Sequence, residues 1–301
     1  MKIGVIGVGD ICQKAYLPVL SIREGVDLLL CTRNRDTLMK VSERYRISSY
    51  THSIQELVDR GIDAAFVHTA TSSHAAIVRL LLSNGIPVYV DKPIAYHYEE
   101  AEELAELCAR KNTIMMVGFN RRYAPLIQRL RQNGDPDIVL MQKNRLFLPG
   151  VPRTFIFDDF IHVVDTLRFL TGHNTTNFSV KGRYEDGQLF SVALELTGMD
   201  TVSIGIMNRD GGKSEEIIEF MTPGNKYIVR DLVHLSHQHD NREVAEKSDD
   251  WEPTLYKRGF YQTVDHFIGC VERNHQPASS IEDALITHRV CEEIVKELVS
   301  G

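Results

Sequence analysis

A glycine pair near the N-terminus, Gly7-Val8-Gly9, limits the fold more than any other part of this sequence. It directly follows the apolar run Lys2–Ile6 and precedes a helix-like pattern. In a dinucleotide-binding turn, one glycine makes the tight turn and another lets the backbone approach the pyrophosphate, while the helix N-terminus offers N–H groups to the phosphates. Cys12 replaces the usual third Gly or Ala and is still small. This context favours nucleotide binding over an ordinary strand–helix turn, with contacts from Gly7, Gly9, Asp10 and Ile11.

Short apolar runs alternate with helix-like stretches through the first half of the chain. The runs are Lys2–Ile6, Asp27–Thr32, Ala64–His68, Pro87–Val90 and Ile114–Val117. Because they are apolar throughout, they are typical of parallel strands that are covered on both faces. Ser72–Ser83 and Tyr98–Lys111 carry helix signals. We therefore predict an α/β protein whose first domain, residues 1–119, is a Rossmann-type, doubly wound parallel sheet.

The second half of the chain has a different pattern. Its strand-like segments are 137–147, 177–184, 188–196, 201–207, 215–221 and 226–229, and short turns separate several of them. Close strands with short turns predict a mainly antiparallel sheet. Helices are expected at Asp158–Leu170, Tyr256–Arg273 and Ile281–Val299, and a polar surface loop at His234–Asp250. Residues 120–301 are thus predicted to form an α+β domain.

Composition excludes several classes of protein. With 43% hydrophobic and 25% charged residues, the chain is of the ordinary globular type. The net charge of −7 and the lack of a long basic run argue against nucleic acid as a partner. Five scattered cysteines fit a reducing compartment without disulfides. We find neither a signal-peptide pattern nor an apolar run long enough to span a membrane, and expect a cytoplasmic protein.

The end of the second strand bears on the choice of cofactor. An Asp or Glu at this position would bind the ribose 2′-hydroxyl of NAD, but residues 28–35 contain no acid. Thr32, Arg33 and Arg35 would instead suit the 2′-phosphate of NADP. We therefore expect NADP(H) to be preferred, with NAD(H) possible. The alternative is that both arginines are solvated residues at the start of a helix.

Asp91-Lys92-Pro93 follows the fourth apolar run, at the sheet edge where ligands bind in open α/β folds. Taken with the other motifs, it resembles the Gfo/Idh/MocA oxidoreductase family over nearly the whole chain. The further matching segments are Val67–His74, Gly118–Tyr123 and Asp158–Asp165, and the phrases VDKP, VGFNRRYAP and DDFIHVVDT are most similar to its MviM-type branch. Asp91 replaces the usual Glu of the family motif, and Phe160 replaces a residue that is commonly small.

The resemblance implies hydride transfer between a nicotinamide cofactor and a secondary alcohol or ketone, often on a sugar or polyol. It implies no metal. The resemblance also implies that residues 120–301 bind the substrate and form the oligomer, since family members often form homodimers or homotetramers. The residues that the resemblance places near the cofactor are Thr69, Ala70, Thr71, His74, Asp91, Lys92 and Asn120. The alternative for His74 is a residue at the start of a helix that makes a local hydrogen bond.

Oxidation of an alcohol also needs a base for the hydroxyl proton, and His162 is the best candidate because imidazole titrates near neutral pH. Asp158, four residues earlier, would lie on the same helical face and orient the ring. Lys92 would bind the reacting oxygen and stabilise its charge. Asp165, on the same face as His162, is a candidate for binding substrate or for a structural ion pair. The competing interpretation of His162 is a histidine satisfied within the core.

Two further groups of residues leave alternatives open. Arg121 and Arg122 could bind a substrate anion, or one of them could pair with an acid. The histidines of His234–His239 suggest a metal, but a solvated loop fits this polar stretch better. A cofactor-binding sensor on the same fold is the rival function. The joint presence of Lys92, Asp158 and His162 favours the enzyme.

Overall fold

A computed structural model describes residues 1–172, 177–198 and 201–300. The chain divides into two compact units. The first contains Met1–Phe119 and Phe260–Leu285, and the second contains Asn120–Gly259 and Ile286–Gly301. The sequence alone assigned residues 260–285 to the second domain. Within the described ranges, no helix combines the length and the apolar composition needed to cross a membrane.

The first unit is built on a six-stranded sheet of order β3-β2-β1-β4-β5-β6, in which every pair is parallel. The strands are β1 Lys2–Ile6, β2 Asp27–Cys31, β3 Tyr50–Thr51, β4 Ala64–Val67, β5 Val88–Val90 and β6 Met115–Val117. All residues of β4, β5 and β6 are buried. The predicted parallel sheet is confirmed, because each of the five apolar runs contains one of its strands.

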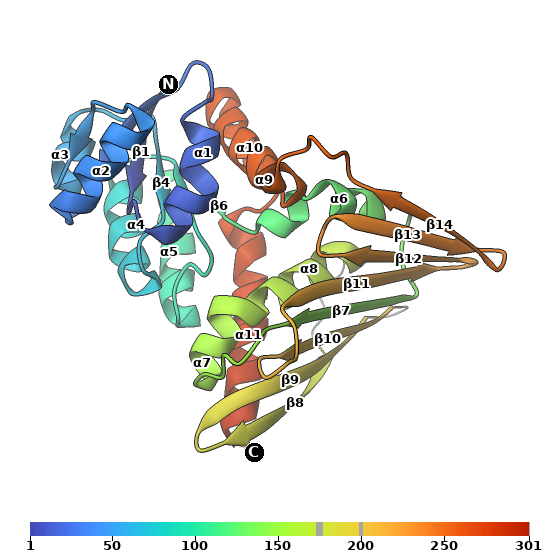
Figure 1. Ribbon diagram of the computed structural model, residues 1–301. Helices are drawn as coiled ribbons and strands as arrows, with labels where there is room; N and C mark the ends of the chain where they lie inside the picture. The colour runs from blue at the N-terminus through green and yellow to red at the C-terminus, as the bar shows by residue number, and fades with distance from the viewer. Residues whose placement is uncertain (173–176, 199–200, 301) are drawn as a thin grey trace. The chain divides into compact units, whose positions relative to one another are not determined.

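Helices lie on both sides of this sheet (Figure 1). They are η1 Cys12–Tyr16, α1 Leu17–Leu20, α2 Arg35–Tyr45, α3 Ile54–Asp59, η2 Thr71–Ser73, α4 His74–Ser83, α5 Tyr98–Lys111 and α10 Phe260–Arg273. Two of them begin at side-chain caps, since Asn34 accepts a hydrogen bond from the Thr37 N–H and Ser53 accepts one from the Glu56 N–H. These caps hold the first turns of α2 and α3 beside the ends of β2 and β3.

The second unit contains an eight-stranded sheet of order β14-β13-β12-β11-β7-β10-β9-β8. Its strands are β7 Ile138–Asn144, β8 Asn177–Glu185, β9 Gln188–Thr197, β10 Val202–Asn208, β11 Glu215–Thr222, β12 Asn225–Arg230, β13 His234–His239 and β14 Arg242–Lys247. β7 and β10 are parallel, and the other paired strands are antiparallel. The predicted mainly antiparallel sheet is therefore confirmed.

One face of this sheet is covered by α8, Ile161–Thr171, which packs against β7 and β10. Gly205 of β10 makes the close approach possible, because a Cβ atom at this position would lie 2.7 Å from Cγ1 of Val163. Phe160 is fully buried and faces the same glycine. Its ring therefore fills the helix–sheet contact.

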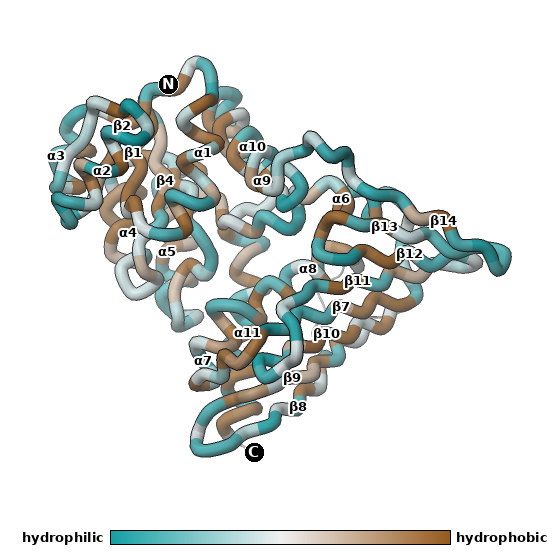
Figure 2. The backbone as a smooth tube through the Cα atoms, viewed as in Figure 1, coloured by the Kyte–Doolittle hydropathy of each residue, from teal (hydrophilic) through white to brown (hydrophobic). Residues whose placement is uncertain are grey.

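Three expected elements of the second half differ from the structure. The predicted loop His234–Asp250 is wrong, because these residues form the β13–β14 hairpin. Its turn residues Asp240 and Asn241 have φ values of 48° and 56°, which is the geometry of a tight type I′ turn. Figure 2 shows that the tip of this hairpin is hydrophilic, whereas β1 and β4 are apolar. The pattern of a buried strand is therefore absent from the hairpin.

The other two corrections concern helices. The helix expected at Tyr256–Arg273 is interrupted at Gly259, which has a φ of +81°, so that α9 Thr254–Lys257 precedes α10. The helix expected to start at Asp158 starts earlier: α7 Pro152–Phe155 and the π-helical segment η4 Ile156–Phe160 lead into α8. The last helix, α11 Ile281–Ser300, agrees with the prediction. η3 Asn120–Tyr123 and α6 Pro125–Gln132 complete the second unit.

Candidate active site

The turn after β1 has the geometry that a dinucleotide requires. Gly7 has a φ of +86°, and a Cβ atom there would lie 2.7 Å from the backbone nitrogen of Thr69, so no other residue fits. A Cβ atom at Gly9 would have nothing within 4 Å, which leaves open space beside this part of the backbone. Since the Gly9 carbonyl accepts a bond from the Gln13 N–H, a helix begins here, and its first N–H groups have no partner within the helix. The turn is therefore suited to bind a pyrophosphate.

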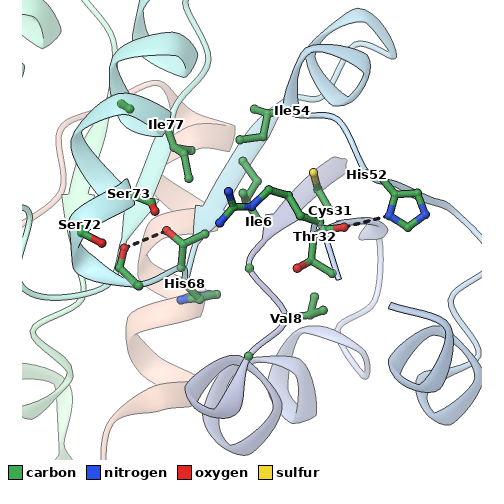
Figure 3. A pocket seen from close by; sticks show the side chains of 16 residues that line it. Ile6, Val8, Cys31, Thr32, His52, Ile54, His68, Ser72, Ser73 and Ile77 are labelled. Atoms are coloured by element: carbon green, nitrogen blue, oxygen red, sulfur yellow. Dashed lines mark hydrogen bonds between the residues drawn. The ribbon is translucent and has the colours of Figure 1, made fainter. Parts of the chain in front are cut away.

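This turn borders a cavity of about 510 Å³ in the first unit (Figure 3). The volume lies in the range of about 300–1,000 Å³ that is usual for ligand pockets. The lining residues predicted from sequence are Gly7, Gly9, Thr32, Arg33, Thr69 and Ala70. The cavity is also lined by Val8 of the glycine turn, by Cys31, and by His68, Ser72 and Ser73 of the predicted segment Val67–His74. The lining residues that sequence reasoning missed are Ile6, His52, Ile54, Ala76 and Ile77. Glycine backbone, hydroxyl groups and aliphatic side chains thus surround one hollow, a combination that fits a dinucleotide.

Thr32 and Arg33 stand at the end of β2 and line this cavity. Arg33 is exposed, and Nδ1 of His52 lies 3.1 Å from the Thr32 carbonyl oxygen. Arg35 is the first residue of α2 and does not contribute to the lining. Asn34, between the two arginines, is occupied as the cap of α2. The edge of the cavity at β2 therefore carries one cationic side chain and a threonine.

His68, directly after β4, is a lining residue with an unusual environment. Its ring is stacked on Tyr16, with 3.8 Å between ring centroids. Burial, and next the nearby His74, lower the pKa of His68 to about 3. Within the described part of the chain, neither of its ring nitrogens has a hydrogen-bond partner. At physiological pH the His68 ring is therefore neutral, and it lines the cavity in the position fixed by its stacking on Tyr16.

The Asp91-Lys92-Pro93 turn follows β5 in the same unit. Oδ1 of Asp91 accepts a hydrogen bond of 2.9 Å from the Lys92 backbone N–H and one of 3.4 Å from the Tyr16 hydroxyl. Burial raises the pKa of Asp91, and the positive charge of Lys92 opposes that shift. The carboxylate thus fixes the backbone on which Lys92 is carried.

His74 joins this turn to the loop after β4. Its Nδ1 lies 2.8 Å from the Pro93 carbonyl oxygen, and its Nε2 lies 3.0 Å from the Thr69 carbonyl oxygen. The ring is buried and is not part of the cavity lining. Its observed contacts therefore connect the segment that carries Lys92 with the segment that carries Thr69. Asp10, Ile11 and Thr71, which were predicted near the cofactor, also lie outside the lining.

Asp158 and His162 belong to one helical segment of the second unit. Asp158 lies in the π-helical turn η4 and is partly exposed, whereas His162 is buried in the first turn of α8. π-Helical turns are rare and frequently occur at functional sites. The segment thus carries an acid and an imidazole within about one turn.

The structure assigns structural partners to four other candidates. Asp165 is buried and binds Arg122 through two contacts of 2.8 and 2.5 Å, and it also accepts from the Thr287 hydroxyl. Arg121 forms a similar pair with Glu216, at 2.6 and 2.7 Å. Asn120 donates to the Arg258 carbonyl oxygen. Of the two roles considered for Asp165, these contacts favour the structural ion pair over substrate binding, because its carboxylate is already engaged.

Comparison with known proteins decides the family. The pattern of an oxidoreductase family with an NAD-binding Rossmann fold, Gfo/Idh/MocA, matches residues 1–119, and that of a YceM-like C-terminal domain matches residues 125–240. The chain is 34% identical to the protein YceM of Salmonella typhimurium, over 100% of this chain and 99% of YceM. The chain belongs to the Gfo/Idh/MocA oxidoreductase family. It is an oxidoreductase with a nicotinamide-binding domain.

Two further relatives place the chain within the Gfo/Idh/MocA family. The crystal structure of the dehydrogenase MviM from Clostridium difficile has a TM-score of 0.95 and 32% identity, over 99% of each chain. The scyllo-inositol 2-dehydrogenase (NAD(+)) of Bacillus subtilis is 25% identical over 78% of this chain and 75% of its own length. The resemblance to the Gfo/Idh/MocA family and its MviM-type branch is confirmed.

Proposed function

We propose that this oxidoreductase uses NADP(H) and acts on a secondary alcohol or the corresponding ketone of a sugar-like or polyol substrate. The observation that carries the cofactor assignment is the edge of the cavity, where Arg33 and Thr32 stand and residues 28–35 supply no carboxylate. An acid at this place would repel a 2′-phosphate, whereas a guanidinium attracts it. The substrate class is supported by the relative named as an inositol dehydrogenase, whose name also gives NAD⁺ as the alternative cofactor.

The chemistry proposed for the chain uses three residues. The bound nicotinamide supplies hydride acceptance and donation. His162 takes the hydroxyl proton in the oxidation direction and returns it in reduction. Asp158 orients that imidazole and stabilises its protonated form, as a carboxylate does beside a catalytic histidine. Lys92 binds the reacting oxygen and stabilises negative charge on it.

The substitution Arg33→Ala tests the cofactor assignment. We expect the Kd for NADPH to rise about tenfold, because a charge-assisted contact is lost, and the Kd for NADH to change less than twofold. Arg44→Ala is a matched control, since Arg44 lies in the last turn of α2 and is not part of the cavity lining. Both constants can be measured by nicotinamide fluorescence. Equal weakening of the two cofactors would remove Arg33 from 2′-phosphate recognition.

We also propose that two or more copies pair through the face of the eight-stranded sheet opposite α8. Side chains alternate along a strand, so Ile204 and Ile206 point away from the face on which Gly205 meets α8. Leu140 of β7 and Ile217 of β11 share that outer face through the strand register. These aliphatic side chains are only half-buried in one chain, and pairing would bury them.

Sedimentation of the protein tests this pairing. The wild type should sediment as a dimer or tetramer, and Ile204→Lys should shift it to the monomer, because a charge would be buried in the interface. Val244→Lys is the control, since Val244 is an exposed apolar residue on the other face of the sheet. A monomeric wild type at micromolar concentration would rule out the interface.

A further inference from the structure

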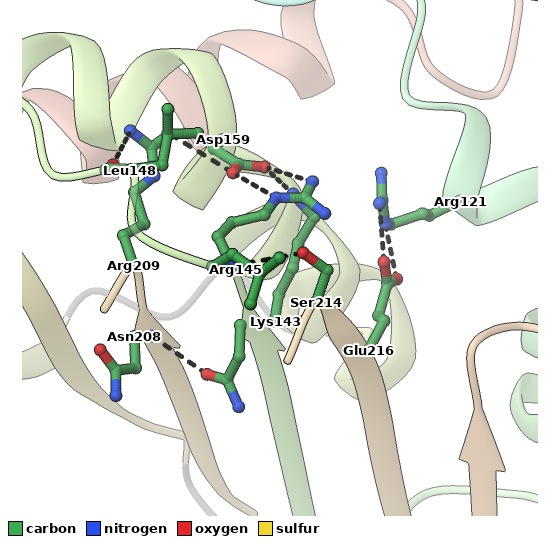
Figure 4. A network of polar contacts seen from close by, with 11 residues as sticks. Arg121, Lys143, Arg145, Leu148, Asp159, Asn208, Arg209, Ser214 and Glu216 are labelled. Carbon is green, nitrogen blue, oxygen red and sulfur yellow. Dashed lines mark hydrogen bonds and ion pairs between the residues drawn. The ribbon is translucent and has the colours of Figure 1, made fainter. Parts of the chain in front are cut away.

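Three cationic side chains of the second unit converge on one carboxylate, that of Asp159 (Figure 4). Asp159, in η4, is contacted by the ammonium of Lys143, by Nε of Arg145 at 3.0 Å, and by a terminal nitrogen of Arg209 at 3.3 Å. Lys143 stands near the end of β7, Arg145 just after it, and Arg209 just after β10. We name these four residues the Asp159 cluster. The ends of two adjacent parallel strands thus bring three cations to one carboxylate.

Two of the three cations are deeply buried. The side chain of Lys143 is 1% exposed and that of Arg209 is 8% exposed, whereas that of Arg145 is 36% exposed. Arg209 also lies over the ring of Phe155, at 4.4 Å from the ring centroid. Taking a charge out of water costs several kcal/mol unless an opposite charge compensates it. One carboxylate compensates one of these cations.

Neighbouring carboxylates do not remove the positive excess. Asp158 attracts Arg209, and Glu216 attracts Arg145 and Lys143, but Glu216 is already held by both contacts from Arg121. Arg258 adds another positive charge near Arg145. Among these described residues there are therefore five cations and three carboxylates. The cations are Lys143, Arg145, Arg209, Arg121 and Arg258, and the carboxylates are Asp158, Asp159 and Glu216.

The environments of Arg145 and Arg209 agree with this excess. The pKa of Arg145 is lowered by burial and then by the like charges of Arg121 and Arg209, with Glu216 opposing the shift. Nε of Arg209 is a buried donor that, within the described residues, has no hydrogen-bond partner. Buried N–H donors are nearly always satisfied in folded proteins, and an orphan donor calls for an explanation such as an absent ligand.

The position of the Asp159 cluster connects it with the proposed chemistry. Asp159 is the sequence neighbour of Asp158 in η4, and His162 lies in the following turn. The side chain of Arg145 is partly exposed, so it can contact a ligand while it also contacts the Asp159 carboxylate. We infer that the Asp159 cluster binds a negatively charged oxyanion group of the substrate, carboxylate or phosphate, and that the guanidinium of Arg145 makes the contact. This inference rests on the proposed function, because it names the substrate class of that enzyme.

The roles within the cluster differ. Arg145 donates from Nε and Nη2 to Asp159, at 3.0 and 3.2 Å. Its other N–H groups, on Nη1 and Nη2, lie in the same plane and match the spacing of carboxylate and phosphate oxygens. Lys143 and Arg209 supply positive charge from the protein side, where little water screens it. Asp159 holds the three cations together and fixes their geometry. A neutral polyol would leave the positive excess uncompensated, so the site discriminates in favour of anionic substrates.

Calorimetric titration of the purified protein tests this site with three probes: D-gluconate, inorganic phosphate and the neutral polyol D-glucitol. We expect gluconate or phosphate to bind at least tenfold more tightly than glucitol, and the stronger of the two anions identifies the group. In Arg145→Gln, the Kd for that anion should rise at least tenfold, whereas Arg145→Lys should recover part of the affinity. Arg183→Gln is the matched control, since Arg183 is an exposed, paired arginine of the same unit.

Two results would overturn the inference. One is unchanged anion affinity in an Arg145→Gln variant whose thermal unfolding matches that of the wild type. The other is wild-type protein that binds neither anion more tightly than glucitol. NADPH binding is measured in the same samples by fluorescence, and Arg145→Gln should leave it unchanged. A protein that binds the anion through Arg145 but binds no nicotinamide cofactor would contradict the proposed function and leave the anion site standing.

Discussion

Replacing Lys92 with alanine is expected to lower kcat by roughly a hundred- to a thousandfold, the usual cost of removing one group that stabilises charge on a reacting oxygen. The Kd for NADPH should change less than threefold, because the residues that line the nucleotide cavity are untouched. A large fall in kcat with a nearly unchanged Kd for NADPH distinguishes a catalytic residue from one that shapes the cofactor site. Lys92→Arg should recover little activity, since a guanidinium differs from an ammonium in shape and hydration.

The measurement is steady-state turnover with the best substrate of a panel of polyols, sugars and sugar acids, alongside fluorescence titration of NADPH. Lys40→Ala is the matched control, because Lys40 is an exposed lysine of α2 in the same unit. Turnover of Lys92→Ala at the wild-type rate would remove Lys92 from the mechanism. Loss of NADPH binding in this variant would instead assign it to the cofactor site.

Replacing His68 with leucine is expected to make the stability of the protein less sensitive to acid. The pKa of His68 is about 3 in the folded protein, against an ordinary value of 6.5. The unfolded chain therefore binds a proton between these values and the folded chain does not. The stability that depends on the neutral ring is fully present above pH 6.5 and is lost as the pH falls towards 3.

At pH 5 the loss that His68 causes amounts to about 2 kcal/mol relative to pH 7.5. When the pH falls from 7.5 to 5, the free energy of unfolding should decrease in both proteins, but in His68→Leu the decrease should be about 2 kcal/mol smaller than in the wild type. Urea denaturation at the two pH values measures this difference. Phe66→Leu is the control, because Phe66 is a buried member of the same ring cluster and has no titrating group. Identical pH slopes in wild type and His68→Leu would show that His68 is not held neutral.

The fold of the first unit could be predicted from sequence because its strands are apolar on both faces and glycines follow β1. Gly7 was identifiable since the motif demands a residue without a side chain, and the structure shows the close approach to Thr69 that explains it. The lining residues His52 and Ile54 could not be found in this way. They reach the cavity because β3, a strand of two residues, pairs with β2, and so short a strand has no periodic pattern.

The partners of the buried ion pairs could not be predicted from the sequence either. Helical spacing puts Asp165 on the same face as His162, but it could not reveal that Arg122, 43 residues away, occupies the carboxylate. Likewise, the adjacent Arg121 and Arg122 look alike in sequence, and each binds a different acid. Asp159 was not singled out, because its three cationic partners come from two strand ends, and no helical or strand spacing connects those residues with it.

The β13–β14 hairpin was missed for a different reason. Every residue of β14 is exposed, and β13 has Leu235 as its one fully buried residue. A strand at the edge of a sheet, solvated on most of its surface, lacks the apolar alternation on which sequence patterns depend. The usable signal was the Asp240-Asn241 pair, since both residue types tolerate the left-handed conformation of a type I′ turn.

The central claim is that this chain binds a nicotinamide cofactor in the cavity beside Gly7 and Gly9 and prefers the 2′-phosphorylated form. Titration of the wild-type protein with NADPH and with NADH, followed by nicotinamide fluorescence under identical conditions, tests it most directly. The account predicts saturable binding of both cofactors, with NADPH about tenfold tighter or more. Tighter binding of NADH would contradict the role assigned to Thr32 and Arg33, and folded protein that binds neither cofactor would contradict the account as a whole.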